Sequence, residues 1–578
     1  MLANRLSANP SVNVLLIERG TIHDTLLASN ILLTHPPFGL IPVKGIKMVP
    51  QKEMKGNDDM IWESRMLGGR TRINGCLYLP GCRAEYDTWG AGWAWDDISK
   101  FFMRSEGRLE LESGKYDTGR EGNEWKTRVI KPHFESSQQY VLPRLNELID
   151  RFASALTRMG VPCLDVFDDP DTPTCFGLFQ RRSMNAAGKR CSTYHAFLPK
   201  SLVRRRQNLT IVLDAHVQRI LYSDNTSEVR ATSLVVEGKH GQRFAVRARH
   251  EIILCGGAVV TPQLLMLRYS RMLLSLMHSG IGPKDHLSQV GKPCIQDLPG
   301  VGSTLVYHLH LLLLTFQQDH VYVPVSFYVP SQDSAHRIVA NPFLVFFELI
   351  RFFLFGTGFF LSAISEYFCY CHTQRLPPNH DKTSHQVPDL ELFWTAAYGS
   401  FTFPKFPAGM GAGSVMVQCS LPKSLGTVRL SPDGADDIKV DPIIDPKYLS
   451  APEDWEVYRR GIVFAQQVGT EMRKGGYPIE EVQLPASQSK EDLDEHIRKF
   501  AIASQHLVSS CRMKPREEGG VVDQQLKVYG IEGLRIADGS VFPGMIASRP
   551  QATVVMIAER CADFIRQGWK EKGLFQDQ

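Results

Sequence analysis

The chain has 578 residues, of which 43% are hydrophobic and 22% are charged. This is the composition of a globular protein long enough for two or three domains, so wholesale disorder is excluded. The formal net charge is only +4 at pH 7 and the basic residues are dispersed, which gives nucleic-acid binding no support. The 12 cysteines contain no Cys-x-x-Cys pair, so we expect neither a metal site nor a disulfide framework, and we expect Cys255 and Cys561 to be buried.

The N-terminal residues predict the end of a helix and then an apolar strand, SVNVLLIERG, that runs into Glu18. In a nucleotide-binding βαβ unit such an acid binds the ribose hydroxyls, and a Gly-rich turn is expected about twenty residues earlier. The chain as given lacks that turn, so we expect the natural sequence to begin further upstream, where a targeting peptide would also lie. Localisation is therefore left open. Taken alone, Glu18 is either a nucleotide ligand or the end of a core strand.

The central part of the chain predicts short strands and helices in succession. A helix is expected over 139–159, and NLTIVLDAHVQRIL after residue 207 reads as strand, turn and strand. HEIILCGGAVVTPQLLML, which starts at residue 250, predicts a strand, a Gly-Gly turn and a helix opened by Thr261 and Pro262. The next residues, 268–278, read as an insertion. GSVMVQCSLPKSLGTVRLSPDG, which starts at residue 413, predicts a hairpin with Asp-Gly at its tip.

One apolar run, FLVFFELIRFFLFGTGFFLSAI at 343–364, has the length of a membrane span. Glu348 and Arg351 interrupt it one helical turn apart, and Gly356 and Gly358 break it. We therefore predict a buried helix end rather than a segment that crosses a bilayer.

The C-terminal part of the chain carries the candidate chemistry. GLRIADGS, which starts at residue 533, is an apolar strand that runs into Asp538, and a helix is predicted from Pro550 onward. A helix N-terminus near an acidic turn is suited to bind an anion or a cofactor, because its first backbone N–H groups have no partners within the helix. His506 lies upstream in a polar loop, and by itself such a histidine is more typical of a structural role.

Several segments together resemble the glucose-methanol-choline (GMC) oxidoreductase family. They are LGGRTRINGCLYLPG from residue 67, the Tyr-Asp-x-Trp and Gly-Trp pairs that follow it, the strand and helix at 250–267 with SGIGP at 279–283, LPGVGSTL at 298–305, HLVSSCRM at 506–513, and SRPQATVVMIAE at 548–559. Residues 306–308 depart from the family pattern. The form GGRTRING resembles that of fungal members that act in secondary metabolism.

The resemblance implies an FAD-dependent enzyme that oxidises an alcohol, with a small-molecule alcohol as substrate and dioxygen or an unknown acceptor. It implies that His506 is the base and that Arg549 occupies the position of the second catalytic group, usually His or Asn. An arginine there would stabilise an alkoxide or a carboxylate, and its charge would lower the pKa of His506. The implied cofactor-binding residues are Glu18, Gly68, Gly69, Asn74, Gly75, Cys76, Leu77, Val217, Ala537, Asp538, Gln551 and Ala552.

The expected fold is α/β, with a Rossmann-like FAD-binding domain and a substrate domain built on an antiparallel sheet and helices. We assign 1–98, 188–305 and 501–578 to the first domain, and 99–187 and 306–500 to the second. Two alternatives stay open: a catalytically impaired relative that acts as a binding or structural protein, and a pyridine-nucleotide dehydrogenase that uses the Glu18 unit. The sequence does not indicate the oligomeric state.

Overall fold

The computed structural model describes most of the chain. The described residues are 1–24, 43–55, 60–105, 107–109, 116–117, 126–129, 145–161, 171, 175–178, 181–183, 190–223, 229–267, 280–302, 317–355, 358–361, 367–376, 387–399, 406–434 and 436–573. The predicted insertion at 268–278 and the atypical residues 306–308 lie outside them.

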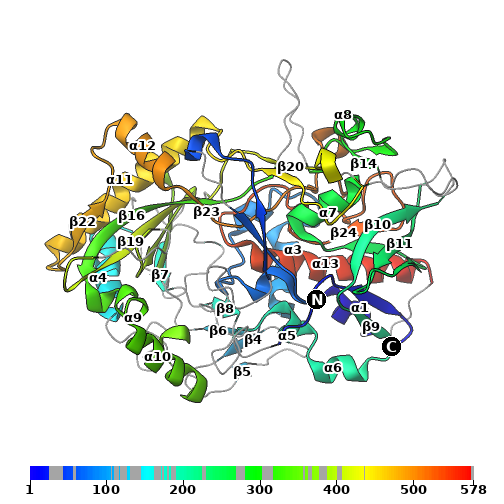
Figure 1. The fold of residues 1–578 in the computed structure, drawn as a ribbon, viewed down its shortest axis with the longest axis horizontal. Helices are drawn as coiled ribbons and strands as arrows, with labels where there is room; N and C mark the ends of the chain where they lie inside the picture. The colour runs from blue at the N-terminus through cyan, green and yellow to red at the C-terminus, as the bar shows by residue number, and fades with distance from the viewer. Residues whose placement is uncertain are drawn as a thin grey trace.

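A first hydrophobic core gathers segments that lie far apart in the chain, on the right of Figure 1. Two parallel strand pairs form part of it, and each pair joins an early strand to a much later one. The long C-terminal helix packs against an early helix and against the N-terminal one. These elements are α1 (Leu2–Leu6), β1 (Val14–Ile17) with β9 (Leu209–Val212), β13 (Ile252–Leu254) with β24 (Leu534–Ile536), α3 (Trp95–Ser105), α7 (Gly257–Met266) and α13 (Pro550–Glu571).

A three-stranded antiparallel meander, β10 (His216–Tyr222), β11 (Ala231–Glu237) and β12 (Arg243–Arg247), adjoins this core. The smaller elements are α2 (Arg83–Tyr86), α5 (Thr193–Phe197), α6 (Lys200–Arg205), α8 (Lys284–Gln289), α9 (His336–Val339), β2 (Val43–Lys47), β3 (Met60–Ser64), β4 (Gly107–Leu109), β5 (Tyr116–Asp117), β6 (Lys126–Val129), β8 (Arg181–Ser183), β14 (Ile281–Gly282) and β15 (Gln296–Asp297).

An antiparallel sheet forms the second half of the molecule, on the left of Figure 1. Its strands run in the order β22, β16, β19, β18, β17 and β7, and β23 also pairs with β16. Their bounds are β7 (Cys175–Leu178), β16 (Val321–Pro330), β17 (Tyr367–Cys371), β18 (Leu390–Thr395), β19 (Met410–Cys419), β22 (Glu480–Gln483) and β23 (Ile502–Ala503).

The sheet is buried on both faces, which explains its nearly continuous apolar strands. Side chains such as Leu392 and Val417 pack in a second core with α4 (Leu145–Arg158), α11 (Pro452–Lys474) and α12 (Lys490–Phe500). Their neighbours in sequence, among them Phe393 and Met416, point to the opposite face and form a separate cluster. That face borders the candidate site.

The two cores follow the predicted domains only in part. Phe101 and Phe102 pack in the first core although they lie beyond the predicted boundary at residue 98. Ile46 and Ile61, from β2 and β3, pack in the second core although they lie before it. The division into domains therefore remains a proposal, and we expect its boundaries to shift at these elements.

Two local predictions are wrong. Helix α7 begins at Gly257 rather than at Thr261, because Asp538 accepts a hydrogen bond from the Gly257 N–H at 2.8 Å and so satisfies the first turn. The predicted hairpin at 413–434 does not form, since β19 pairs with β16 and β18. Its second segment, β20 (Thr427–Arg429), instead pairs with β21 (Ile443–Asp445).

The apolar run from residue 343 is buried only in part. Helix α10 (Pro342–Ile350) has no buried residue, so the prediction of a buried helix end is wrong for this helix, whereas Phe352, Phe359 and Phe360 of the turns that follow are buried. Within the described part of the chain, no helix has both the length and the apolar character needed to cross a bilayer.

Candidate active site

One cavity of about 2100 Å³ lies between the two cores and is lined by residues of both. Its volume exceeds the range of about 300 to 1,000 Å³ that is usual for a small-molecule pocket, so it has room for a dinucleotide cofactor and a substrate together. The predicted site residues that line it are Glu18, Gly68, Gly69, Asn74, Gly75, Leu77, Val217, His506, Ala537, Asp538, Arg549 and Gln551. The structure thus brings together residues from across the whole chain, and their roles stay predictions.

Two predicted residues do not line the cavity. Ala552 is 0% exposed inside α13, so the helix itself separates it from the opening. Cys76 is also 0% exposed, and its N–H donates to Oδ1 of Asn74 at 3.1 Å within a tight turn. Cys561 is buried as expected, whereas Cys255 is exposed because it faces the cavity.

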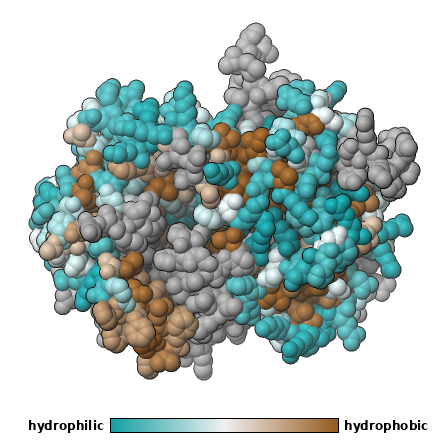
Figure 2. Space-filling view, in the orientation of Figure 1, coloured by the Kyte–Doolittle hydropathy of each residue, from teal (hydrophilic) through white to brown (hydrophobic). Residues whose placement is uncertain are grey.

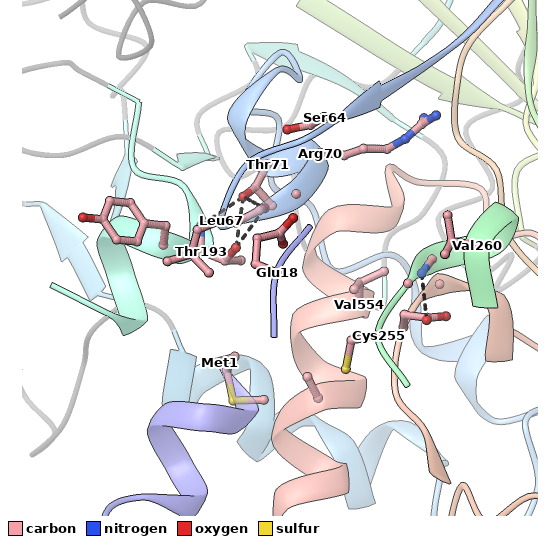
Figure 3. A pocket seen from close by; sticks show the side chains of 18 of the residues that line it. Met1, Glu18, Ser64, Leu67, Arg70, Thr71, Thr193, Cys255, Val260 and Val554 are labelled. Carbon is pink, nitrogen blue, oxygen red and sulfur yellow. Dashed lines mark hydrogen bonds between the residues drawn. The ribbon is translucent and has the colours of Figure 1, made fainter. Parts of the chain in front are cut away.

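The ends of two strands place the acidic residues of the cavity. Glu18 follows β1 directly and Asp538 follows β24, while the apolar Val217 lies near the start of β10. Loops at the carboxyl ends of parallel strands form the usual nucleotide-binding crevice of open α/β sheets. Figure 3 shows Glu18 on one side of this space and Val260, on α7, on the other. Burial raises the pKa of the Glu18 carboxyl, and its Oε1 accepts a hydrogen bond from the Gly20 N–H at 2.9 Å.

Glycines leave open space where a flat ring could approach the backbone. Gly69 and Gly257 both have positive φ, +55° and +77°, and a Cβ at either position would meet no atom within 4 Å. At Gly75 a Cβ would meet only the Leu77 side chain, at 3.9 Å. All three residues line the cavity, so the residues present fit a large planar cofactor.

Asp538 uses its carboxylate inside the protein. Its Oδ2 accepts hydrogen bonds from the Gly257 N–H at 2.8 Å and from the Thr261 hydroxyl at 2.7 Å, and its Oδ1 accepts one from the Ser540 N–H at 2.8 Å. The side chain therefore joins β24 to the start of α7. It positions the cavity wall rather than offering a free charge to a ligand.

The Gly-rich segment is joined to α13 by a side-chain pair. Asn74 donates from Nδ2 to Oε1 of Gln551, and its Oδ1 accepts a hydrogen bond from Arg190 Nη1 at 2.8 Å. Because Arg190 is buried, this contact holds the Asn74 side chain in one orientation. The two predicted flavin-contacting segments are thereby kept at a constant separation.

Hydrogen bonding determines which ring nitrogen of His506 carries a proton. His320 Nε2 lies 2.9 Å from the Ser420 carbonyl oxygen, which only accepts, so Nε2 carries the proton and Nδ1 of neutral His320 is an acceptor. His506 Nδ1 lies 3.0 Å from that Nδ1 and 3.0 Å from the Ser504 hydroxyl oxygen, and a proton on His506 Nδ1 is compatible with both contacts because both partners can accept. His506 Nε2 then keeps a lone pair, as a general base requires.

Burial keeps both histidines neutral. It lowers the pKa of His320 to about 3, with Arg549 acting in the same direction. Burial also lowers the pKa of His506 well below its usual value. Electrostatic repulsion from Arg549 and Arg70 acts in the same direction. The His506 backbone is held by Asp319, whose Oδ1 accepts its N–H at 2.6 Å.

Replacing His320 with glutamine is expected to weaken the dependence of stability on pH. Folded His320 has a pKa of about 3 against a reference of 6.5, so between these values the unfolded chain binds more protons and stability is lost as the pH falls. For each pH unit that the pH falls, the free energy of unfolding should decrease by about 1.4 kcal/mol more in the natural chain than in His320→Gln. Urea unfolding at a series of pH values measures both slopes. The exposed His240→Gln is the matched control and should keep the natural slope, whereas an unchanged slope in His320→Gln would contradict the expectation.

Arg549 does not present a bare cation to the cavity. It occupies the N-cap position of α13 without a capping hydrogen bond from its side chain, is 5% exposed, and its Nη1 donates to Oε2 of Glu391, which is 0% exposed. Gln418 Nε2 donates to the same oxygen at 2.8 Å. A buried carboxylate from β18 therefore compensates the charge of Arg549, and the two side chains form an ion pair between the two halves of the molecule. The catalytic role expected of Arg549 stays a prediction.

An aromatic wall lies beside this ion pair. Phe368, Phe393 and Met416 occupy directly paired positions on β17, β18 and β19, so their side chains stand in one row on one face of the sheet. The Phe368 and Phe393 rings stack at 5.2 Å, and the Arg549 guanidinium lies 5.3 and 5.5 Å from their centres. Tyr322 contacts Phe393 edge-on at 5.3 Å. All of these side chains line the cavity, which makes its sheet side apolar and aromatic.

Sequence reasoning missed His320, Glu391 and the aromatic wall. One signal was available: Glu391 interrupts the apolar strand LELFWT, and a carboxylate in a strand buried on both faces needs a partner. His320 gave no comparable signal, because a single histidine before a strand is common.

Comparison with known proteins agrees with this geometry. The family models described as GMC oxidoreductase match residues 15–310 and 422–558. A dehydrogenase from Strobilurus tenacellus, str4, is 28% identical and covers 98% of this chain and 92% of its own length. An alcohol dehydrogenase [acceptor] from Pseudomonas putida is 29% identical, with coverages of 98% and 93%. Formate oxidase from Aspergillus oryzae shares the fold at 21% identity, with a TM-score of 0.80 and coverages of 99% and 96%.

The chain therefore belongs to the GMC oxidoreductase family. It is an FAD-dependent oxidoreductase with a mixed α/β fold and an antiparallel sheet, as its sequence predicted.

Proposed function

We propose that the protein oxidises the CH–OH group of an alcohol by hydride transfer to FAD, with His506 as the base. The observation that carries this proposal is the chain of contacts from the Ser420 carbonyl through His320 to His506, which leaves Nε2 of His506 unprotonated in a ring that lines the cavity. The lowered pKa keeps His506 unprotonated at neutral pH, which is the form that a general base needs.

In the proposed reaction, His506, Arg549 and Glu391 have different roles. Bound FAD supplies a flavin ring that accepts hydride from the carbinol carbon. Nε2 of His506 takes the hydroxyl proton, and the Arg549 guanidinium, which also lines the cavity, stabilises the developing charge on the substrate oxygen. Glu391 holds Arg549 in place and compensates its charge, so neutral alcohols are accepted as well as anionic ones.

The aromatic wall supports an apolar alcohol as substrate. Phe368 and Phe393 offer ring surfaces rather than hydrogen-bond donors to the part of the substrate beyond the hydroxyl group, and Tyr322 packs edge-on against Phe393. The printed names of similar proteins include an alcohol dehydrogenase and a fungal aryl-alcohol oxidase, in agreement with this class. They include both dehydrogenases and oxidases, so the electron acceptor is dioxygen or another compound, and the test distinguishes the two.

The test is anaerobic mixing of the FAD-loaded protein with a panel of alcohols while the flavin absorption band is followed. We expect benzylic and longer aliphatic primary alcohols to bleach the band, and dioxygen added afterwards to restore it. Tertiary alcohols are the matched control, because they carry no hydrogen on the carbinol carbon and should leave the band unchanged. If no alcohol bleaches bound flavin, the chain is a catalytically impaired relative and the proposal fails.

A further inference from the structure

An exposed apolar surface lies at the edge of the cavity and has no part in the proposed chemistry. It consists of the outward side chains of α10 and of the π-helical turn Arg351–Phe355 that follows it. Figure 2 shows hydrophobic surface at the lower left, where α10 lies in Figure 1. We call this surface the α10 patch; its members and their exposed fractions are Phe343 77%, Phe346 59%, Phe347 58%, Phe353 48%, Leu354 72% and Phe355 70%.

The opposite side of the same segment is packed, so the patch is held in place by the fold. Phe352 is 3% exposed and forms a small cluster with Ile338, Phe359 and Phe360, against which Leu344 and Leu349 pack. The helix is also capped, since Asn341 Oδ1 accepts the N–H of Phe343 at 3.0 Å. The phenylalanines therefore face outward as a consequence of an ordered helix.

The patch carries no unpaired charge. The only charged residues of the segment, Glu348 and Arg351, bond to each other from Nη1 to Oε1 at 2.8 Å. Glu348 also accepts the Phe359 N–H at 2.6 Å, and its side chain is 12% exposed. An apolar phase can cover such a surface without leaving a buried charge unsatisfied.

The patch continues into the cavity. Val345, Leu349 and Phe353 line the cavity, together with Phe359 and Phe360 from the next turn. An apolar path therefore leads from the exposed rings to the space that holds the substrate. Phe353 belongs both to the α10 patch and to the cavity lining, so the patch adjoins the candidate active site.

We propose that the α10 patch docks the protein onto the surface of a lipid bilayer, with its phenylalanines in the interfacial region and the mouth of the cavity against the membrane. Each of these side chains buries ~200 Å² when fully covered, so the exposed fractions amount to roughly 750 Å² of apolar surface. This is close to the about 800 Å² per partner of a stable protein interface, so the area does not decide the occupant. The continuity of the patch with the apolar cavity lining favours a bilayer, because a second copy would cover this side of the cavity with protein. Helices that lie in the plane of a membrane bind through such an apolar face.

Docking would give an apolar substrate a direct route to the cavity, and this consequence rests on the proposed function. An apolar alcohol dissolved in the bilayer could reach the cavity along Phe353 and Phe359 without passing through water. The docking itself depends only on the patch, so the two proposals can fail separately.

The test is flotation of the FAD-loaded protein with neutral phosphatidylcholine vesicles in a density gradient. We expect the natural protein to float, with little change between low and high salt, because apolar contacts are not screened. The variant Phe343→Ser/Phe347→Ser/Leu354→Ser, whose residues do not line the cavity, should lower the vesicle partition coefficient about 100-fold. The matched control is Met103→Ser/Phe244→Ser/Ile443→Ser, which removes three exposed apolar side chains elsewhere and should float like the natural protein.

A second measurement keeps the test decisive if the triple variant does not fold. Phe347→Trp should add a fluorescence component that brominated lipids quench, and the natural tryptophans provide the baseline. The proposal is overturned if the natural protein stays with the soluble fraction, if the control variant loses binding equally, or if Phe347→Trp gains no quenching. It is also overturned if light scattering shows a dimer that the triple variant dissociates while neither form binds vesicles.

Discussion

Flavin reduction in His506→Ala is expected to be slower by roughly two to four orders of magnitude, the usual contribution of a positioned general base. The reason is that Nε2 of His506 carries a lone pair, because the proton of the ring lies on Nδ1 next to His320. Alanine provides no proton acceptor in its place. The contacts around Glu18, Gly69 and Asn74 remain, so FAD should stay bound. Anaerobic stopped-flow mixing with an alcohol that reduces the natural protein measures the rate constant.

The matched control is His496→Ala. His496 is 3% exposed, its Nε2 lies 2.9 Å from the Pro324 carbonyl oxygen, and it does not line the cavity. Its loss should lower the melting temperature while leaving the reduction rate constant within about twofold. A His506→Ala protein that reduces its flavin as fast as His496→Ala would show that another group accepts the proton.

Arg549→Met is expected to destabilise the fold by about 3 to 5 kcal/mol, because it leaves the carboxylate of Glu391 buried without its partner. Glu391→Gln should destabilise for the same reason, with the guanidinium as the unpaired charge. The double variant Arg549→Met/Glu391→Gln should recover most of the loss, since no buried charge is then left alone. Chemical unfolding of the four proteins at one pH measures these differences.

Arg460→Met is the matched control for the same substitution at an exposed site. Arg460 pairs with Glu456 at 2.7 Å, but both side chains are about half exposed, at 45% and 51%. Exposed pairs contribute little, so this variant should unfold nearly like the natural protein. Equal stability of Arg549→Met and Arg460→Met would mean that Glu391 is not held as an ion in the folded protein.

The pH dependence of the reaction provides a second check on Arg549. Its positive charge opposes protonation of His506, so its removal should raise the pKa of His506. The acid limb of the profile of kcat/KM against pH should then move to higher pH in the double variant, in which the fold is recovered. An unmoved limb would place the guanidinium too far from His506 to act on it.

Much of the local structure and the membership of the site could be predicted from the sequence. The strand before Glu18, the strand before Asp538 and the helix that starts at Pro550 all form where their residues indicate. Each depends on an apolar run, a turn acid or a proline, whose effects extend over only a few neighbouring residues. Helix α7 was misplaced because its first turn depends on Asp538, which is distant in sequence.

By itself the sequence determined only part of the cavity lining, because the motifs around Gly69, Asn74, His506 and Asp538 resemble those of the family, and the structure places these residues around one cavity. Only the tertiary structure decided what His506 and Arg549 can do chemically. The tautomer of His506 depends on His320, and the charge of Arg549 depends on Glu391. Both partners come from the antiparallel sheet region, far from the motifs in sequence, and electrostatic contacts of this kind depend on distance in space rather than along the chain.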